Sequence, residues 1–161
     1  MIYVIIGQSG AGKTTFVRDR FIRATDPVVV EDIIPYTKCN GFCLIGKYGT
    51  GERTEGTDTL AYNAKDKIKR QIKKLIEKKE TAIVLEGDRI NNNDMFSFLA
   101  TLRMPVKLYL ITCTIDTSIK RLQAAGSKIT PQFIRATKTK SLNNFIKWGG
   151  VFAGEVINND D

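Results

Sequence analysis

The stretch Gly7-Gln8-Ser9-Gly10-Ala11-Gly12-Lys13-Thr14 directly follows the apolar run Met1-Ile2-Tyr3-Val4-Ile5-Ile6, and together they decide the fold. The stretch has the form G-x-x-x-x-G-K-[ST], a loop that joins a buried strand to a helix and wraps phosphate groups. Its glycines permit tight turns, so that successive backbone N–H groups point inward at phosphate oxygens. The positive end of the helix that begins near Lys13 adds to this attraction. The pattern therefore predicts a nucleoside triphosphate site.

Individual positions in this loop have distinct expected roles. The Lys13 ammonium is expected to reach the β- and γ-phosphates of ATP, and the Thr14 hydroxyl is expected to help hold Mg²⁺. The predicted phosphate-binding residues are Gly7, Gln8, Ser9, Gly10, Ala11, Gly12, Lys13, Thr14 and Thr15.

Length and composition narrow the class of protein. A chain of 161 residues suits one domain, 1–161, with one sizeable core. No apolar run reaches the ~20 residues that cross a membrane, and the strand-like start is unlike a signal peptide, so we expect a cytoplasmic protein with no membrane partner. The chain has three cysteines and no histidine. Because histidine is absent, a general base must be a carboxylate or another group. The net charge of +8 favours a polyanionic partner over lysines that merely solvate the surface.

Apolar runs and helix-like segments alternate along the chain. Strands are predicted over 1–6, 28–33, 42–46, 81–85 and 106–112. Helices are predicted over 13–24, 59–79, 94–102, 115–125 and 131–146, with a frayed tail over 158–161. This alternation predicts an α/β fold of three layers, α/β/α, around a mostly parallel five-stranded sheet.

The predicted helix over 59–79 has two unlike faces. Apolar residues recur at three- and four-residue spacing on one face and form a stripe for burial. The other face is rich in lysine and includes Lys69, Lys73 and Lys74. Such a face either is only solvated or contacts a phosphate backbone, and these three lysines are the candidate DNA contacts.

Acidic residues follow two of the predicted strands. Asp32 comes after the second strand, where a carboxylate can take the proton of an attacking hydroxyl. Glu86 and Asp88 follow the fourth strand, and Glu86 is the candidate Mg²⁺ ligand. Asp88 is a second candidate for the metal or for positioning the acceptor, and we count it among the catalytic candidates. Since the carboxyl ends of parallel strands share one sheet edge, all three are expected near the phosphate loop.

Two further segments complete the predicted site. Residues 117–128 are expected to form a lid whose Arg121 contacts the phosphates and stabilises charge on the transferred phosphoryl group. The glycine-rich segment 46–58 is expected to recognise the acceptor. In it, Tyr48 offers a stacking surface, and Thr57 and Asp58 offer hydrogen bonds to a base, although Asp58 could equally cap the following helix.

The phosphate loop, Asp32 and Arg121 together resemble a P-loop kinase of the polynucleotide-kinase type. Over nearly its whole length the chain resembles the bacteriophage 5-hydroxymethyluracil DNA kinases, through its size, its phosphate loop, residues 56–58 and the run Glu86-Gly87-Asp88-Arg89. That resemblance implies ATP, Mg²⁺ and transfer to the hydroxymethyl group of a modified pyrimidine in DNA, with Arg89 among the acceptor contacts. A kinase for free nucleotides or nucleosides is the main alternative, and a non-catalytic nucleotide switch is another.

Overall fold

A mostly parallel β-sheet forms the middle layer of the computed structural model, which describes residues 1–22, 26–49, 55–80 and 82–160. Its seven strands lie in the order β2-β3-β4-β5-β1-β6-β7. The strands are β1 (Ile2–Gly7), β2 (Val28–Val30), β3 (Tyr36–Cys39), β4 (Phe42–Ile45), β5 (Ile83–Glu86), β6 (Val106–Thr112) and β7 (Ala153–Asn158). Neighbouring strands from β4 to β7 are parallel, whereas β3 is antiparallel to both β2 and β4.

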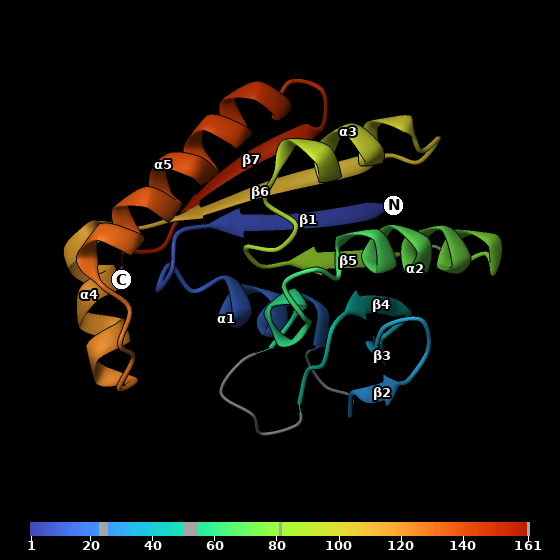
Figure 1. Cartoon of the computed structure of the whole chain (residues 1–161), viewed down its shortest axis with the longest axis horizontal. Coiled ribbons are helices and arrows are strands. Elements are labelled where there is room, and N and C mark those ends of the chain that lie inside the picture. The colour runs from blue at the N-terminus through green and yellow to red at the C-terminus, as the bar shows by residue number, and fades with distance from the viewer. Residues whose placement is uncertain (23–25, 50–54, 81, 161) are drawn as a thin grey trace.

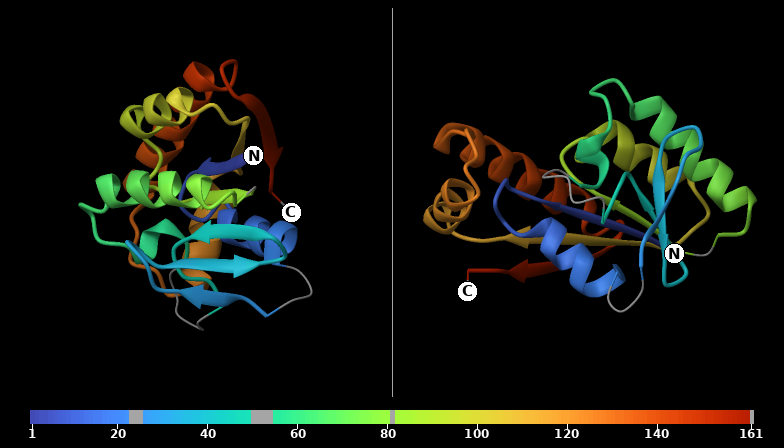
Figure 2. Two further views of the ribbon diagram at one scale, coloured as in Figure 1. Left: turned by 90° about the vertical axis from the view of Figure 1, so that its right-hand side faces the viewer. Right: turned by 90° about the horizontal axis from the view of Figure 1, so that it is seen from below.

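Helices cover both faces of this sheet (Figures 1 and 2). They are α1 (Lys13–Val17), a π-helical turn η1 (Arg18–Ile22), a 3₁₀ turn η2 (Thr57–Thr59), α2 (Lys65–Glu77), α3 (Asn93–Thr101), α4 (Ile115–Ala124) and α5 (Pro131–Trp148). The right-hand view of Figure 2 shows α1 on one side of the strands and α2 and α3 on the other. The predicted α/β/α fold is confirmed, but the predicted count of five strands is wrong.

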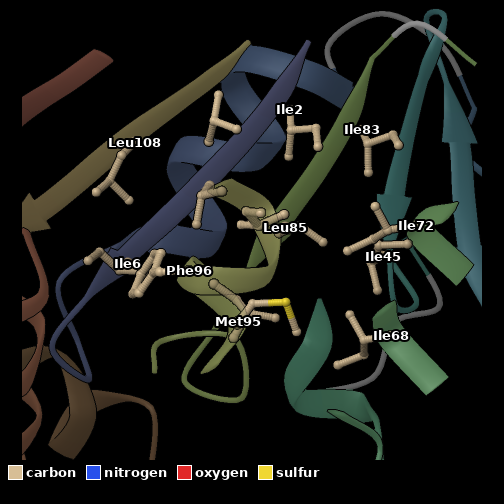
Figure 3. Close-up of a cluster of buried hydrophobic side chains, with 14 of the residues drawn as sticks. Ile2, Ile6, Ile45, Ile68, Ile72, Ile83, Leu85, Met95, Phe96 and Leu108 are labelled. Carbon is tan, nitrogen blue, oxygen red and sulfur yellow. The ribbon is translucent and has the colours of Figure 1, made fainter. Parts of the chain in front are cut away.

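The period-two alternation of β1 explains why the sheet is covered on both faces. Ile2, Val4 and Ile6 are fully buried in the larger core, against α2 and α3, while Ile5 is buried in a second core beneath α1. Figure 3 shows Ile6 beside Phe96 of α3, in the same buried cluster as Ile68 and Ile72 of α2. Each such buried side chain stabilises the fold by roughly 1.5–3 kcal/mol. The predicted apolar stripe of this helix is therefore the face that packs on the sheet.

The two unpredicted strands are β3, which lies between β2 and β4, and β7, which forms the edge of the sheet beyond β6. β3 joins β4 through the two-residue turn Asn40-Gly41, whose φ angles of 51° and 79° are both positive. This pair is a strong hairpin signal that the sequence carried. β7 corrects the predicted frayed tail, because Asn158 pairs with Thr112 of β6 and the N–H of Asn159 donates to the Thr112 carbonyl.

Helix boundaries differ modestly from the predicted ones. The predicted helix over 59–79 starts later, since residues 57–59 form a separate 3₁₀ turn and α2 begins at Lys65. Parts of the predicted segments 13–24, 46–58 and 81–85, and residue 161, lie outside the described residues. Across the described ranges, no helix has the length and apolar character needed to span a bilayer.

Candidate nucleotide-binding site

The phosphate loop connects β1 to α1 and is shaped by glycine. Gly12, directly before α1, has φ of 89°, and a Cβ at this position would lie 2.3 Å from the Asn159 amide nitrogen. That amide donates to the Ala11 carbonyl at 2.8 Å, so residues after β7 support the loop. Because the first N–H groups of a helix lack partners within it, α1 presents Lys13, Thr14 and Thr15 as anion donors.

Two other positions of the loop are used to anchor it. The Gln8 side chain is buried and donates to the Cys113 carbonyl at 2.7 Å and to the Ser118 hydroxyl at 3.2 Å. The N–H of Ser9 donates to the Thr137 hydroxyl of α5 at 3.3 Å. Both residues therefore tie the loop to β6, α4 and α5, and their contact with phosphate stays a prediction.

Lys13 and Thr14 converge with Glu86 at the end of β5. The Lys13 ammonium donates to the Gln8 carbonyl at 3.1 Å, and the Thr14 hydroxyl donates to Glu86 Oε1 at 3.3 Å. β5 is the direct neighbour of β1, so parallel pairing brings its carboxyl end to the phosphate loop. Glu86 thus lies where the sequence placed it.

Glu86 is a buried carboxylate with a perturbed pKa. It is 2% exposed, and burial raises its pKa from 4.5 to about 7. The neighbouring Lys13 charge and the hydroxyls of Tyr48 and Thr14 act against this rise, whereas the charge of Asp58 adds to it. A carboxylate kept in this environment is typical of a functional site rather than of a core.

Tyr48 and Thr57 support Glu86 instead of facing an acceptor. Tyr48 is 1% exposed and its hydroxyl donates to Glu86 Oε2 at 3.0 Å, so the predicted stacking surface is wrong. The Thr57 hydroxyl is buried as well and donates to the Glu86 carbonyl oxygen at 2.6 Å. Its predicted hydrogen bond to a base is therefore wrong too. Both residues hold the end of β5 in place.

A cavity of about 510 Å³ opens between the phosphate loop and the segment after α4. Thr14, Glu55 and Asp58 line one side, and residues of 122–129 line the other. Asp58 Oδ1 accepts the N–H of Asp88 at 3.2 Å, which fixes its carboxylate at this wall. The cavity combines an acidic wall with a phosphate-binding edge, so it is large and polar enough for an acceptor molecule.

Glu55 is a site residue that the sequence did not reveal. It is 5% exposed, and both of its oxygens contact the Arg18 guanidinium, Oε1 at 2.7 Å and Oε2 at 2.8 Å. The N–H of Gly49 donates to Oε1 at 3.0 Å. This pairing, with a hydrogen bond from Glu55 as its main cause, raises the pKa of Arg18. Since the partners are far apart in the chain, only the fold brings them together.

Arg121 lies where a phosphate-contacting lid residue is needed. It lines a second cavity, of about 390 Å³, together with the phosphate loop. A Cβ on Gly12 would lie 3.9 Å from Arg121 Nη1, which shows how closely the guanidinium approaches the loop. α4 carries it there directly from the end of β6. The structure brings Arg121 to the expected place, and its contribution to catalysis stays a prediction.

A solved structure of deoxyadenosine kinase from M. mycoides shares this fold. The structure with the products dCMP and dCDP is 14% identical over 98% of this chain and 90% of that chain, with a TM-score of 0.50. The dCTP complex is 12% identical, with coverages of 99% and 90% and a TM-score of 0.48. The dATP complex is 12% identical, with coverages of 99% and 91% and a TM-score of 0.46. No protein-family model and no curated protein sequence matches the chain.

Asp32 does not belong to this site, so its predicted role as the catalytic base is wrong. β2 lies at the edge of the sheet, and β3 and β4 separate it from β5. The Asp32 carboxylate accepts hydrogen bonds from Lys74 and from Gln71 of α2, and Lys78 lies 3.7 Å away. These contacts, with Lys74 as the main cause, lower its pKa to about 2. Asp32 fastens α2 to the sheet edge.

The predicted DNA contacts on α2 are partly engaged within the protein. Lys69 pairs with Asp94 at 2.7 Å and Lys74 pairs with Asp32, whereas Lys73 is exposed. Two of the three predicted phosphate contacts thus already have a carboxylate partner. This arrangement favours a structural role for Lys69 and Lys74, and their binding of DNA stays a prediction.

Asp88 and Arg89 lie on the loop after β5, beside Asp58. The Asp88 carboxylate is 44% exposed and pairs with Lys140 of α5 at 3.0 Å. Arg89 donates through Nε to the Leu60 carbonyl at 2.7 Å. Both residues therefore lie at the outer rim of the site, and their predicted roles stay predictions.

The donor set at Thr14 and Glu86 fits Mg²⁺. This cation prefers oxygen ligands and is usually held by one or two protein groups, with phosphate oxygens and water filling the other positions. A hydroxyl and a buried carboxylate 3.3 Å apart, beside a phosphate loop, provide this arrangement. Within the described residues, no group of three or more acidic, cysteine or histidine side chains is placed to hold a metal by itself. A cation bound here would thus depend on the nucleotide.

Proposed function

We propose that this chain is an ATP-dependent kinase that transfers the γ-phosphoryl group to a hydroxyl of a nucleoside or nucleotide. The observation that carries the proposal is the meeting of Lys13, Thr14 and Glu86 next to the acidic cavity, which Thr14 also lines. Phosphoryl transfer depends mainly on positioning and on neutralising charge, and this arrangement serves both. The likeness to a deoxyadenosine kinase is in line with a nucleoside acceptor.

Each charged group on the ATP side of the site has a proposed role. Lys13 and Arg121 balance the charge of the triphosphate, while the first N–H groups of α1 cradle it. Thr14 and Glu86 would hold Mg²⁺, and this cation would supply neutralisation of negative charge on the phosphates. Tyr48 fixes the Glu86 carboxylate through its hydroxyl.

The acceptor half of the site points to Asp58 as the proton acceptor. Its carboxylate lines the cavity beside Thr14, whereas Glu55 is fully occupied by Arg18 and Gly49. The acceptor hydroxyl oxygen bonds to the γ-phosphorus as the bond to the β,γ-bridging oxygen breaks, and ADP leaves with that electron pair. The hydroxyl proton passes to Asp58.

A second candidate acceptor is the hydroxymethyl group of 5-hydroxymethyluracil in phage-type DNA. The net charge of +8 and the exposed basic residues of α2 favour a polyanionic acceptor. A base acted on in this way must leave the duplex stack, at a cost of a few kcal/mol. The two candidates share every donor-side residue and differ only in what enters the cavity.

Labelled ATP offered with separate acceptors tests both candidates. Free deoxynucleosides, nucleoside monophosphates and duplex DNA containing 5-hydroxymethyluracil are each supplied, and the labelled product is identified by mass. We expect Lys13→Ala to abolish transfer and Asp58→Asn to lower turnover roughly a hundred-fold with ATP affinity retained. Asp116→Asn, at an exposed position at the start of α4, is the matched control. Absence of label in every acceptor would contradict the kinase proposal, and label only in DNA would select the second candidate.

A further inference from the structure

Tyr62 is an unusually exposed aromatic residue next to the acceptor side of the site. It is 89% exposed, although Leu60 and Ala64 on either side of it are buried in the core. These two anchors hold the segment between η2 and α2 so that the ring projects into solvent. A ring that projects from a fixed segment in this way is available to stack on a planar ligand.

The Arg89 guanidinium lies over the Tyr62 ring. The guanidinium carbon lies 4.2 Å from the centroid of the Tyr62 ring, within the range of a cation–π contact. The hydrogen bond from Arg89 Nε to the Leu60 carbonyl fixes the guanidinium in this position. The ring is thus oriented, while most of its surface still faces solvent.

Positive charge lies on α2, the helix that follows the Tyr62 segment. Lys67, Arg70 and Lys73 are exposed on this helix, and no ion pair links them to other residues in the described ranges. Lys67 also lines a groove of about 380 Å³ beside the Tyr62 segment, together with Lys47, which pairs with Glu31 of the same groove at 3.1 Å. An aromatic ring with nearby lysine and arginine is the combination by which proteins bind single-stranded nucleic acid, through base stacking and phosphate contacts.

This surface is continuous with the acceptor cavity. Arg89 directly follows Asp88, whose N–H donates to Asp58 on the cavity wall. Tyr62 comes four residues after Asp58 in the chain. A chain whose reactive unit occupies the cavity would therefore carry a neighbouring unit over the rim. We infer that Tyr62, backed by Arg89, is a stacking platform for a nucleobase that flanks the phosphorylated unit of a single-stranded polynucleotide acceptor.

This inference rests on the proposed function for the location of the acceptor cavity, and a binding experiment separates the two. A fluorescent single-stranded oligothymidine is titrated with the full chain and its variants in the presence of Mg²⁺. We expect Tyr62→Ala to weaken binding about ten-fold, and Tyr62→Phe, which retains the ring, to bind within about two-fold of the native chain. Ile146→Ala is a control at a 71% exposed residue of α5 and should leave binding unchanged.

Two results would overturn the inference. One is equal binding by the native chain and Tyr62→Ala, and the other is loss of binding in Tyr62→Phe to the same extent as in Tyr62→Ala. Transfer from labelled ATP to free nucleosides is measured on the same variants and should not change with Tyr62→Ala. If transfer fails for every acceptor while binding depends on the ring, the kinase proposal falls and the platform stands.

Discussion

Replacing Glu86 by glutamine should make the ligand-free protein more stable at pH 8 and weaken its hold on Mg²⁺–ATP. Glutamine has nearly the same shape, and its side chain can still accept from Tyr48 and contact Thr14. It cannot ionise, so the substitution removes the cost of a buried negative charge. The protein would thus lose its proposed metal ligand and gain stability at the same position.

The size of the effect follows from the pKa of Glu86. This pKa is raised from 4.5 to about 7, and the corresponding difference in free energy is roughly 3 kcal/mol. A raised carboxyl pKa means that the folded protein retains a proton which the unfolded chain has lost. Stability of the native chain therefore falls as the pH rises from about 4.5 to about 7 and is level above that. The advantage of Glu86→Gln should grow from near zero below pH 4.5 to roughly 3 kcal/mol at pH 8.

Urea unfolding at several pH values between 5 and 8, in metal-free buffer, measures this difference directly. Thermal unfolding should show it as a rise of roughly 5–10 °C at pH 8. Tyr48→Phe is the matched control, because it removes a hydrogen bond that lowers the Glu86 pKa. It should destabilise the protein more at pH 8 than at pH 5. Added Mg²⁺–ATP should stabilise the native chain more than Glu86→Gln.

A difference between Glu86→Gln and the native chain that is the same at pH 5 and pH 8 would refute the reasoning. So would a variant that is less stable than the native chain at pH 8. Either result would mean that the ionised carboxylate is well solvated or fully compensated by Lys13.

Three other substitutions, the last with Gly41→Ala as its control, probe separate parts of the structure. Asp32→Asn should leave turnover unchanged and lower stability at neutral pH. Because the pKa of Asp32 in the folded protein is lowered to about 2, this loss of stability should disappear as the pH falls from about 4 through about 2. Urea unfolding measures the stability and the labelled-ATP assay measures the turnover, and a collapse of turnover would restore the catalytic role of Asp32. Arg121→Ala should reduce turnover about a hundred-fold with a smaller change in ATP affinity. Steady-state kinetics measures both quantities, and an unchanged turnover would exclude Arg121 from the mechanism. Gly12→Ala should abolish nucleotide binding, since the added Cβ would meet Asn159. The control Gly41→Ala, at φ of 79° with open space around it, should cost only about 1–2 kcal/mol of stability. ATP binding by Gly12→Ala in a calorimetric titration would contradict the expected loss.

The features that the sequence predicted well are local ones. The phosphate loop is a contiguous stretch, and its glycines, Lys13 and Thr14 are fixed by neighbours along the chain. The stripe of α2 likewise depends only on helical spacing. Glu86 was found because its strand is buried on both faces and ends abruptly in polar residues.

The features that the sequence predicted poorly depend on strand order. Asp32 would have faced the phosphate loop if β2 had lain beside β1, but β5 and the β3–β4 hairpin take up the intervening positions. The turn Asn40-Gly41 is the local sequence signal for that hairpin. Tyr48 illustrates a second limit of sequence-based prediction. Its burial depends on a hydrogen bond to Glu86, 38 positions away in the chain, which only the fold reveals.

The support of the loop by Asn159 has a consequence for synthesis of the protein. The ribosome makes the phosphate loop well before β7 and Asn159, which emerge only after residues 153–159 have been translated. Until then, Ala11 lacks its amide partner and the outer edge of β6 is uncovered. A nascent chain is thus unable to assemble the complete loop, and the capacity to bind nucleotide arises only once residues 153–159 have left the exit tunnel.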